Sequence, residues 1–503
     1  MPDAVAQASV TDPRGYLLVL AIILPVAGTL LSFVIGGRNA ERIALALIPA
    51  GLAVAIAILA SVAQADEALT YVLGGWNPPL GITLRADGLS AAMLVTTAVV
   101  IGATGLFARG DFGTPRGVSE ARAPFVFWTL LLAVWAALNA VFLGNDLFNL
   151  YVALELLTFA AVPLVCLDGR AETLTAALRY LLFALAGSVL YLLGVALLYG
   201  AYGTLDITLL SGQIRADRAT SIAAALMTVG LLAKTALFPL HLWLPPAHAG
   251  APTAASAILS ALVVKGSFFL IARIWFDALP GLFNDFAAQL LAALGACAIV
   301  LGGVLALRQA RLKMLIAYST VAQIGYLFLM FPLLIGASQH WGDVAWTGGW
   351  LQVFSHAFAK SAMFMAAGLI AEAVGHDRIA ELGGIGRTLP VTLFAFGLGG
   401  LSLIGVPPSG GFVAKWLLLT AAAMEGQWWW ALVILVGGLL AGGYVIRVLA
   451  KAMAGTPLAL RATVPRWREA VALGLAVCAV LLGLVPLQPS ELLLIGRAGA
   501  FGG

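Results

Sequence analysis

The stretch from Thr228 to Leu270, TVGLLAKTALFPLHLWLPPAHAGAPTAASAILSALVVKGSFFL, decides how the rest of the chain is organised. It is apolar enough to lie in a bilayer, yet it contains Lys234, Lys265 and four prolines that a continuous helix does not tolerate. A lysine at the centre of a membrane helix costs about 2.5–3.5 kcal/mol, so such residues usually have a function. Broken helices occur at membrane depth only where the freed backbone faces protein or water. The stretch therefore predicts part of an internal, hydrated path for ions.

The composition of the chain indicates an integral membrane protein. Of its 503 residues, 62% are hydrophobic and 10% are charged, whereas an ordinary soluble domain is roughly 25% charged. The 56 glycines suit close packing of helices in lipid. Three single cysteines, Cys166, Cys297 and Cys478, have neither CxxC nor Cys/His spacing. We therefore expect no disulfide framework and no iron–sulfur or zinc site.

About fourteen apolar runs are long enough to cross a membrane, and short polar connectors separate them. They lie near residues 16–35, 43–63, 87–107, 123–142, 146–167, 174–202, 219–238, 253–276, 285–307, 313–332, 347–371, 391–420, 429–450 and 470–487. No connector is long enough to form a soluble domain. The sequence thus predicts an all-α polytopic protein with a single membrane domain, residues 1–503.

The charges of the connectors predict the orientation of the chain. Connectors after odd-numbered spans hold about 16 Lys and Arg, Arg116 among them, whereas the other connectors and both termini hold about five. By the positive-inside rule, both termini should lie on the outer side of a membrane that we expect to be the bacterial plasma (inner) membrane. Six basic residues remain inside the spans as candidates for chemistry, namely Arg179, Lys234, Lys265, Arg273, Lys360 and Lys415.

A second interruption lies in GVPPSGGFVAKW at residues 405–416, where Pro-Pro and Gly-Gly break span twelve and Lys415 follows just beyond the break. In span seven the lysine precedes the break, and here it follows. Broken spans five apart with reversed order predict two inverted five-helix repeats, spans 4–8 and 9–13. Pro/Gly breaks without a repeat are also common in membrane helices. The expected parts are N-terminal spans over 16–107, a first repeat over 123–276, a second over 285–450, and a final span over 470–487.

Span five carries the acidic counterpart, Glu155, within DLFNLYVALELLTFAAVPLVCL. An unpaired carboxylate at this depth would be neutral or would need a cation. One interpretation is a neutral Glu hydrogen-bonded between helices. The other is an ion pair with Lys234, in which the carboxylate favours the charged lysine and desolvation favours the neutral one. Such a pair would act as a proton switch.

Several segments together resemble one family. They are FLGNDLFNLYVALELL, LLAKTALFPLHLWLPPAHAGAPTAASAILSALVVKG, RLKMLIAYSTVAQIGY, SHAFAKSAMFMAAGLI, ELGGIGRTLP and GVPPSGGFVAKW. In this order, over about residues 85–450, they are similar to the antiporter-like proton-translocating subunits of respiratory complex I, membrane-bound hydrogenases and Mrp-type cation/proton antiporters. The segments before Glu155 and DGLSAAML from Asp87 most resemble the D-type subunit of Mrp antiporters.

The resemblance implies roles for matching residues. Glu155 and Lys234 would form the coupling pair, Lys265 the central relay and Lys415 the terminal lysine. The connecting polar groups would be His248, His356 and Lys360. His248 could instead cap the broken helix, Lys360 could snorkel or pair structurally, and His241 and His340 are expected at interfaces. Gln323 stands where some relatives have a histidine, and since glutamine cannot take up a full proton, a step there would need water.

No cofactor or metal is expected in this chain, because GGIGR at residues 383–387 lacks a βαβ context and signatures for flavin, haem and iron–sulfur clusters are missing. One hypothesis is a subunit of a multi-subunit antiporter that exchanges protons for Na+ or K+. The alternative is a membrane subunit of a redox complex resembling complex I or a hydrogenase, or a proton-coupled module of another membrane complex. Expected partners are other membrane subunits, protons, the cation and the lipid bilayer, and no nucleic acid.

Overall fold

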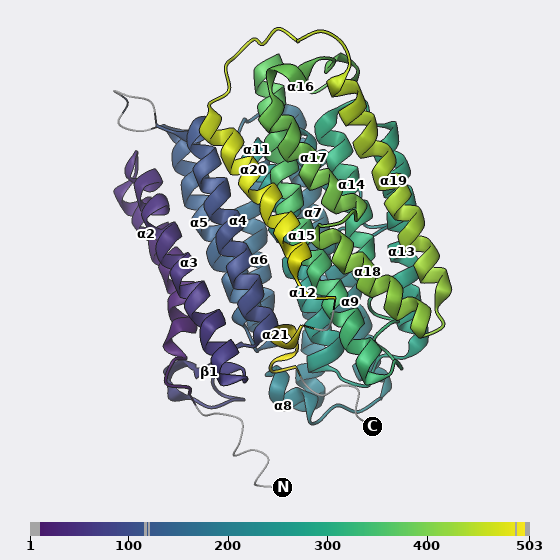
Figure 1. Cartoon of the computed structure of the whole chain (residues 1–503). Coiled ribbons are helices and arrows are strands. Elements are labelled where there is room, and N and C mark those ends of the chain that lie inside the picture. The colour runs from purple at the N-terminus through teal and green to yellow at the C-terminus, as the bar shows by residue number, and fades with distance from the viewer. Residues whose placement is uncertain (1–10, 115–117, 119–120, 488–489, 498–503) are drawn as a thin grey trace.

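The computed structural model describes residues 11–114, 118, 121–487 and 490–497 of the chain, and Arg116 therefore lies outside it. Eleven helices in this part are long and apolar enough to cross a membrane. They are α2 (Tyr16–Ile35), α3 (Asn39–Ala65), α4 (Gly88–Phe112), α5 (Arg122–Leu143), α6 (Leu147–Val165), α7 (Ala171–Tyr202), α13 (Asp285–Arg308), α15 (Gln339–Val374), α19 (Trp428–Met453), α20 (Arg466–Leu481) with η5 (Leu482–Leu484), and a composite of α11 (Thr253–Ile258), η2 (Leu259–Val263), α12 (Val264–Arg273) and η3 (Ile274–Ala278). Figure 1 shows them side by side in one helical body. The prediction of a helical, polytopic membrane protein is confirmed.

Shorter elements complete the fold. Four further helices fall in the expected apolar ranges, α9 (Arg218–Thr235), α14 (Leu312–Phe328), α17 (Pro390–Ile404) and α18 (Gly410–Met424). Because these are shorter or less apolar than the eleven, the count of fourteen spans stays a prediction. The connectors contain α8 (Ile207–Ser211), α10 (Leu244–Gly250), α16 (Ile385–Thr388), α21 (Glu491–Leu494), η1 (Leu73–Gly75) and η4 (Ile379–Glu381). The strands β1 (Leu69–Val72) and β2 (Thr83–Ala86) form an antiparallel hairpin that the sequence analysis did not foresee.

The first break follows α9. This helix ends at Thr235 because Ala236 adopts a left-handed backbone with φ 58°, which is uncommon for a residue other than glycine. The indole N–H of Trp243 donates to the carbonyl of Ala233 at 2.9 Å. The same carbonyl also accepts from the N–H of Ala236 at 3.3 Å, so two donors close this end of the helix. The break expected from the prolines is present, and α10 resumes helical structure at Leu244.

The second break separates α17 from α18. Helix α17 ends at Ile404, where Gly405 has φ 87°, and Ser409 caps the start of α18 by accepting from the Phe412 N–H at 3.2 Å. The interruption covers residues 405–409, so it contains the expected Pro-Pro pair, whereas Gly410 and Gly411 already belong to α18. Lys415 consequently lies inside α18, in its second turn.

Small residues allow the helices to pack closely. A side chain at Gly187 of α7 would lie 2.4 Å from the backbone oxygen of Gly230 of α9. A side chain at Gly295 of α13 would lie 2.6 Å from the oxygen of Gly325 of α14. Both helix pairs therefore touch through their backbones, as is usual for helices in lipid.

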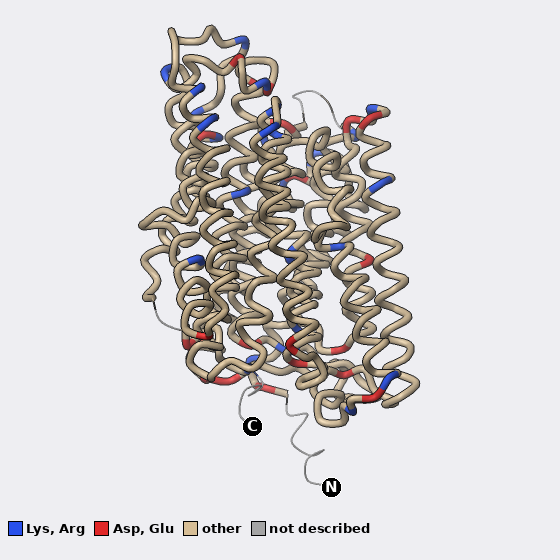
Figure 2. Tube along the Cα trace, turned by 90° about the vertical axis from the view of Figure 1, so that its right-hand side faces the viewer, with Lys and Arg blue, Asp and Glu red and all other residues tan. Residues whose placement is uncertain are grey.

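Helix α20 crosses the body and ties its parts together (Figure 1). It packs against α4, α15 and α17. Near its start, buried Arg468 donates to Asp111 of α4 at 2.6 Å and to Glu372 of α15 at 2.7 Å. In Figure 1, β1 from the N-terminal part of the chain and α21 from the C-terminal part lie at the same end of the body, opposite α16. Figure 2 shows most charged residues at these two ends and isolated ones between them.

Candidate functional site

The side chains of Glu155 and Lys234 meet inside the helical body. Glu155 comes from α6 and Lys234 from the last turn of α9, and Lys234 Nζ lies 2.9 Å from Glu155 Oε1. Lys234 also donates to Thr158 Oγ1 at 3.0 Å, and Ser188 of α7 donates to the same Glu155 oxygen. The two charged side chains are only 7% and 13% exposed. The structure therefore contains the ion pair that one interpretation of span five required.

Lys265 is completely buried near the middle of the composite helix. It follows the π-helical turn η2, a type of local irregularity that often occurs at functional sites. Its ammonium donates to the carbonyl of Ser260, and within the described residues it makes no ion pair. A hydrogen bond of 2.9 Å from Thr235 to Ser267 joins the helix of Lys265 to α9, next to Lys234. Lys265 and the first pair are thus linked through neighbouring residues.

A stripe of polar side chains runs along α15. Gln352, His356 and Lys360 are spaced four residues apart and so share one face of this helix. Lys360 donates to the carbonyl of Ile316 at 3.0 Å and to Ser319 of α14. Lys360 is buried and hydrogen-bonded here, so it does not snorkel toward the membrane surface.

The same stripe leads to Lys415. Gln352 donates to Gln323 Oε1 at 2.8 Å, and Gln323 Nε2 donates to the carbonyl of Leu403 at 3.2 Å. Lys415 Nζ donates to that same carbonyl at 2.5 Å and to the carbonyl of Ile404 at 3.3 Å. Sequence reasoning did not single out Gln352, although its spacing from His356 and Lys360 was visible.

Two buried histidines have free ring nitrogens. Neither nitrogen of His248 or His356 makes a hydrogen bond within the described chain. His248 stacks on Phe364 with ring centres 4.8 Å apart, and its backbone carbonyl accepts from the Ser256 hydroxyl. His248 therefore does not cap a helix through its ring. His356 interacts electrostatically with Lys265, Lys360 and Lys415, which places it among the central lysines.

The remaining candidate arginines lie elsewhere. Arg179 is exposed on α7. Arg273 is buried and pairs with Asp87 at 2.6 Å and Asp277 at 2.7 Å. It also donates to Ser90 at 2.9 Å. The sequence analysis missed this cluster, whose only local signal was the spacing of four between Arg273 and Asp277.

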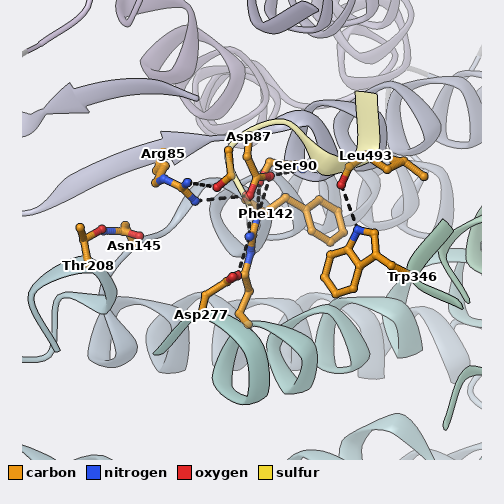
Figure 3. Close-up of polar contacts among 11 residues, drawn as sticks. Arg85, Asp87, Ser90, Phe142, Asn145, Thr208, Asp277, Trp346 and Leu493 are labelled. Atoms are coloured by element: carbon orange, nitrogen blue, oxygen red, sulfur yellow. Dashed lines mark hydrogen bonds and ion pairs between the residues drawn. The ribbon is translucent and has the colours of Figure 1, made fainter. Parts of the chain in front are cut away.

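Residues 490–497 cover the Arg273 cluster. Arg85, which pairs with Asp87, donates to the carbonyl of Gly496. Trp346 donates to the carbonyl of Leu493 at 2.9 Å, as Figure 3 shows. The cluster therefore joins β2, α4, η3 and α21 at one end of the body and is separate from the central lysines.

A polar cavity of about 500 Å³ opens at the opposite end. Its wall includes the connector between α10 and α11, close to His248, and charged residues from five regions, namely Asp111, Asp168, Arg170, Arg311, Lys313, Glu372, Asp377 and Arg468. Lys313 donates to the carbonyl of Ala251 in that connector at 2.8 Å. Burial opposes ionisation of Asp168, but hydrogen bonds from Thr173 and Arg170 outweigh it and lower the pKa of this carboxyl. Water at this end can thus approach the broken segment that carries His248.

Aromatic rings fill the space between Lys265 and the other end. Phe268 packs edge-on against Phe328 with ring centres 5.4 Å apart, and the ring centres of Phe268 and Trp350 are 5.5 Å apart. Trp275 and Phe331 extend this block with centres 5.0 Å apart. The centre of the body is therefore more accessible to polar groups from the cavity than from the end that carries α21.

Comparisons with known proteins agree with this architecture. Residues 144–441 match the family described as NADH:quinone oxidoreductase/Mrp antiporter, TM. The N-type subunit of the NADH-quinone oxidoreductase of Desulforudis audaxviator is 34% identical, and the match covers 80% of each chain. The D-type subunit of the Na(+)/H(+) antiporter of Alkalihalophilus pseudofirmus is 29% identical, over 81% of this chain and 80% of that one. A chain of the Mrp complex from Dietzia sp. DQ12-45-1b superposes with a TM-score of 0.85 at 26% identity, covering 97% of both chains.

These matches and the fold define an antiporter-like integral membrane subunit. The chain belongs to the NADH:quinone oxidoreductase/Mrp antiporter transmembrane family, so the resemblance noted in the sequence is confirmed. Relatives of the N type from oxidoreductases and of the D type from antiporters are similarly close.

Proposed function

We propose that the chain is the proton-translocating subunit of a multi-subunit antiporter that exchanges protons for Na+ or K+. The observation that carries this proposal is the buried pair of Glu155 and Lys234 at the first break. A buried ammonium beside a carboxylate holds its proton, and without that carboxylate desolvation favours the neutral amine. Movement of Glu155 away from Lys234 would therefore release a proton inside the membrane.

The polar groups beyond the first pair supply the rest of the route. We infer that the proton passes to Lys265, then along His356 and Lys360, and finally to Lys415. His248 would connect this route to the polar cavity. The hydrogen bonds from Lys360 to Ser319 and from Gln352 to Gln323 support a connected path between the middle of the body and the second break. Gaps between hydrogen-bonded groups would be bridged by water, since a direct link reaches only about 3 Å.

We also propose how the chain crosses the membrane. The chain would form one membrane domain in a bacterial inner membrane, with both termini outside and inverted repeats around the two breaks. The common end of β1 and α21 supports termini on one side (Figure 1). Cysteines introduced at Arg387 and Arg215 should react with an impermeant reagent from opposite faces. Reaction from the same face would refute this topology.

A redox complex is the second candidate, favoured by the 34% identity to an N-type subunit of NADH-quinone oxidoreductase. There, electron transfer in other subunits would drive the same proton path. The test is to extract the chain gently from its own membranes, identify the subunits that copurify, and measure proton movement in vesicles. Proton movement on adding Na+ or K+ would support the antiporter. Movement only with an electron donor, together with flavin and iron–sulfur subunits, would refute it in favour of the redox complex.

A further inference from the structure

A groove of about 600 Å³ runs between α17 and α19 on the surface of the helical body. Its walls are apolar and include Gly397, Leu401, Ile404, Val445, Leu449 and Met453. The groove exists partly because Gly397 has no side chain. A Cβ atom at this position would meet only Leu449, at 3.6 Å, so a larger side chain would fill the groove without displacing the backbone.

The groove has the depth of one membrane leaflet. It begins beside Gly386, at the end of the body that carries α16, and reaches Val406 in the second break. The 15 residues of α17 span about 22 Å at the usual helical rise. Half of a hydrocarbon core of about 30 Å is roughly 15 Å, and the headgroup region adds several more. One acyl chain with its glycerol and phosphate therefore matches the length of the groove.

The mouth of the groove is positively charged. Arg387 lines it, is exposed, and makes no ion pair within the described part of the chain. Lys451, in the last turn of α19, is exposed at the same end. Basic residues that flank a gap between membrane helices at headgroup level attract anionic lipid headgroups.

We propose that this groove binds one anionic glycerophospholipid, with its phosphate against Arg387 and an acyl chain that extends to Ile404. The site would be specific for the negative headgroup, which distinguishes it from the general contact of a helical surface with lipid. This proposal is independent of the proposed function, because it concerns lipid binding and not proton transfer.

The deep end of the groove suggests what the lipid does. Ile404 lines the groove, and its carbonyl accepts from Lys415 Nζ at 3.3 Å. An acyl chain at this place covers the broken segment from the side of the membrane. It would keep water out of the groove and so separate Lys415 from the headgroup region.

The test uses the full chain in vesicles with photoreactive lipids. Phosphatidylglycerol and phosphatidylcholine, each with a diazirine at the end of one acyl chain, are compared by mapping the labelled peptides. We expect phosphatidylglycerol to label residues 401–406 preferentially. Arg387→Gln should weaken this labelling roughly fivefold, as expected for one cation near a membrane surface. Gly397→Leu should abolish it.

Matched variants provide the controls. Arg466→Gln removes an exposed arginine that belongs to α20 and does not line the groove. Gly474→Leu adds a side chain at an exposed glycine of α20 that has open space around it. Both should label as the unchanged protein does. Equal labelling by the two lipids, or labelling that neither Arg387→Gln nor Gly397→Leu reduces, would overturn the proposal. Crosslinking of a cysteine at Phe394 to another subunit in intact membranes would overturn it too, because a protein would then occupy the groove.

Discussion

At the first break, the N–H of Ala236 and the indole of Trp243 both donate to the carbonyl of Ala233, and Lys234 pairs with a carboxylate from another helix. At the second break the lysine itself is the cap, because Lys415 donates to the last carbonyls of α17, those of Leu403 and Ile404. Both ammonium groups are thus stabilised, but by different means. Lys234 is stabilised by the full charge of Glu155 on another helix, and Lys415 by the dipole at the end of its own broken span.

In the proposed mechanism, this difference would give the two breaks different tasks. A carboxylate that moves away would remove most of the stabilisation of Lys234, so the first break would switch between holding and releasing a proton. Backbone carbonyls cannot change their charge, so the second break offers Lys415 a constant environment. Lys415 would respond to the protons that reach it, whereas Lys234 would respond to the movement of Glu155.

The largest effect is expected at Glu155. Glu155→Gln keeps the volume of the side chain but leaves a buried ammonium without its counter-charge, which costs about 3–5 kcal/mol. Proton-coupled transport in vesicles of the intact complex should fall more than about a hundredfold. Glu172→Gln, an exposed glutamate in the first turn of α7, is the matched control and should leave transport unchanged.

The same comparison predicts the outcome at Lys234. Lys234→Met and Lys234→Arg should both fail, the second because a guanidinium does not release its proton at accessible pH. Normal transport by a properly assembled Glu155→Gln variant would show that the first pair is only structural.

A smaller loss is expected at the second break. Lys415→Met removes hydrogen bonds from a charged donor to two carbonyls, worth about 1.5–3 kcal/mol, and transport should drop about tenfold to a hundredfold. The rate is measured in the same vesicles, with Arg466→Met at the exposed start of α20 as the control. A loss equal to that of Glu155→Gln would mean that the two breaks act as one unit and would remove the distinction drawn between them.

Gln352 lies between the two breaks, and transport should depend on its hydrogen bond to Gln323. Gln352→Leu removes the hydrogen bond to Gln323 and should slow transport about fivefold, since one hydrogen bond contributes about 1 kcal/mol. Gln352→His keeps an N–H donor at this place and should restore more than half of the rate. Gln309→Leu, which removes only a bond to the carbonyl of Leu305 near the end of α13, is the control. No recovery with Gln352→His would indicate that the position is needed for packing alone.

The smallest effect is expected at Trp243. Trp243→Phe removes the cap of Ala233 and should lower the free energy of unfolding by about 1 kcal/mol while transport continues. Thermal unfolding of the purified chain measures this change. Trp275→Phe, which removes a side-chain bond to Thr228, is the comparison for loss of an indole N–H without loss of a cap. Loss of transport with unchanged thermal stability in Trp243→Phe would contradict a purely capping role.

The sequence predicted the helices and both breaks because their signals are local. Apolar runs mark the spans, and the prolines and glycines around Pro239 and Gly405 mark the interruptions. The hairpin formed by residues 69–72 and 83–86 was missed, because four-residue strands in a connector give little alternation.

Contacts between distant residues could not be predicted in the same way. Asp87 and Arg273 lie 186 residues apart and neither position alone indicates the other. Gln352 carries no charge, so it did not stand out beside His356 and Lys360. The roles of the predicted relay residues stay predictions, although the ion pair of Glu155 and Lys234 was foreseen because a buried lysine needs a partner.

The cover over the Arg273 cluster has a consequence for biosynthesis. The guanidinium of Arg85 donates to the carbonyl of Gly496, which lies 411 positions further along the chain. The N–H of Gly88 likewise bonds to the carbonyl of Ile495 at 3.2 Å. During synthesis these residues follow long after α4, so the N–H of Gly88 and the guanidinium of Arg85 must rely on water until they arrive. A chain interrupted before residue 490 would lack these contacts and would leave the start of α4 exposed.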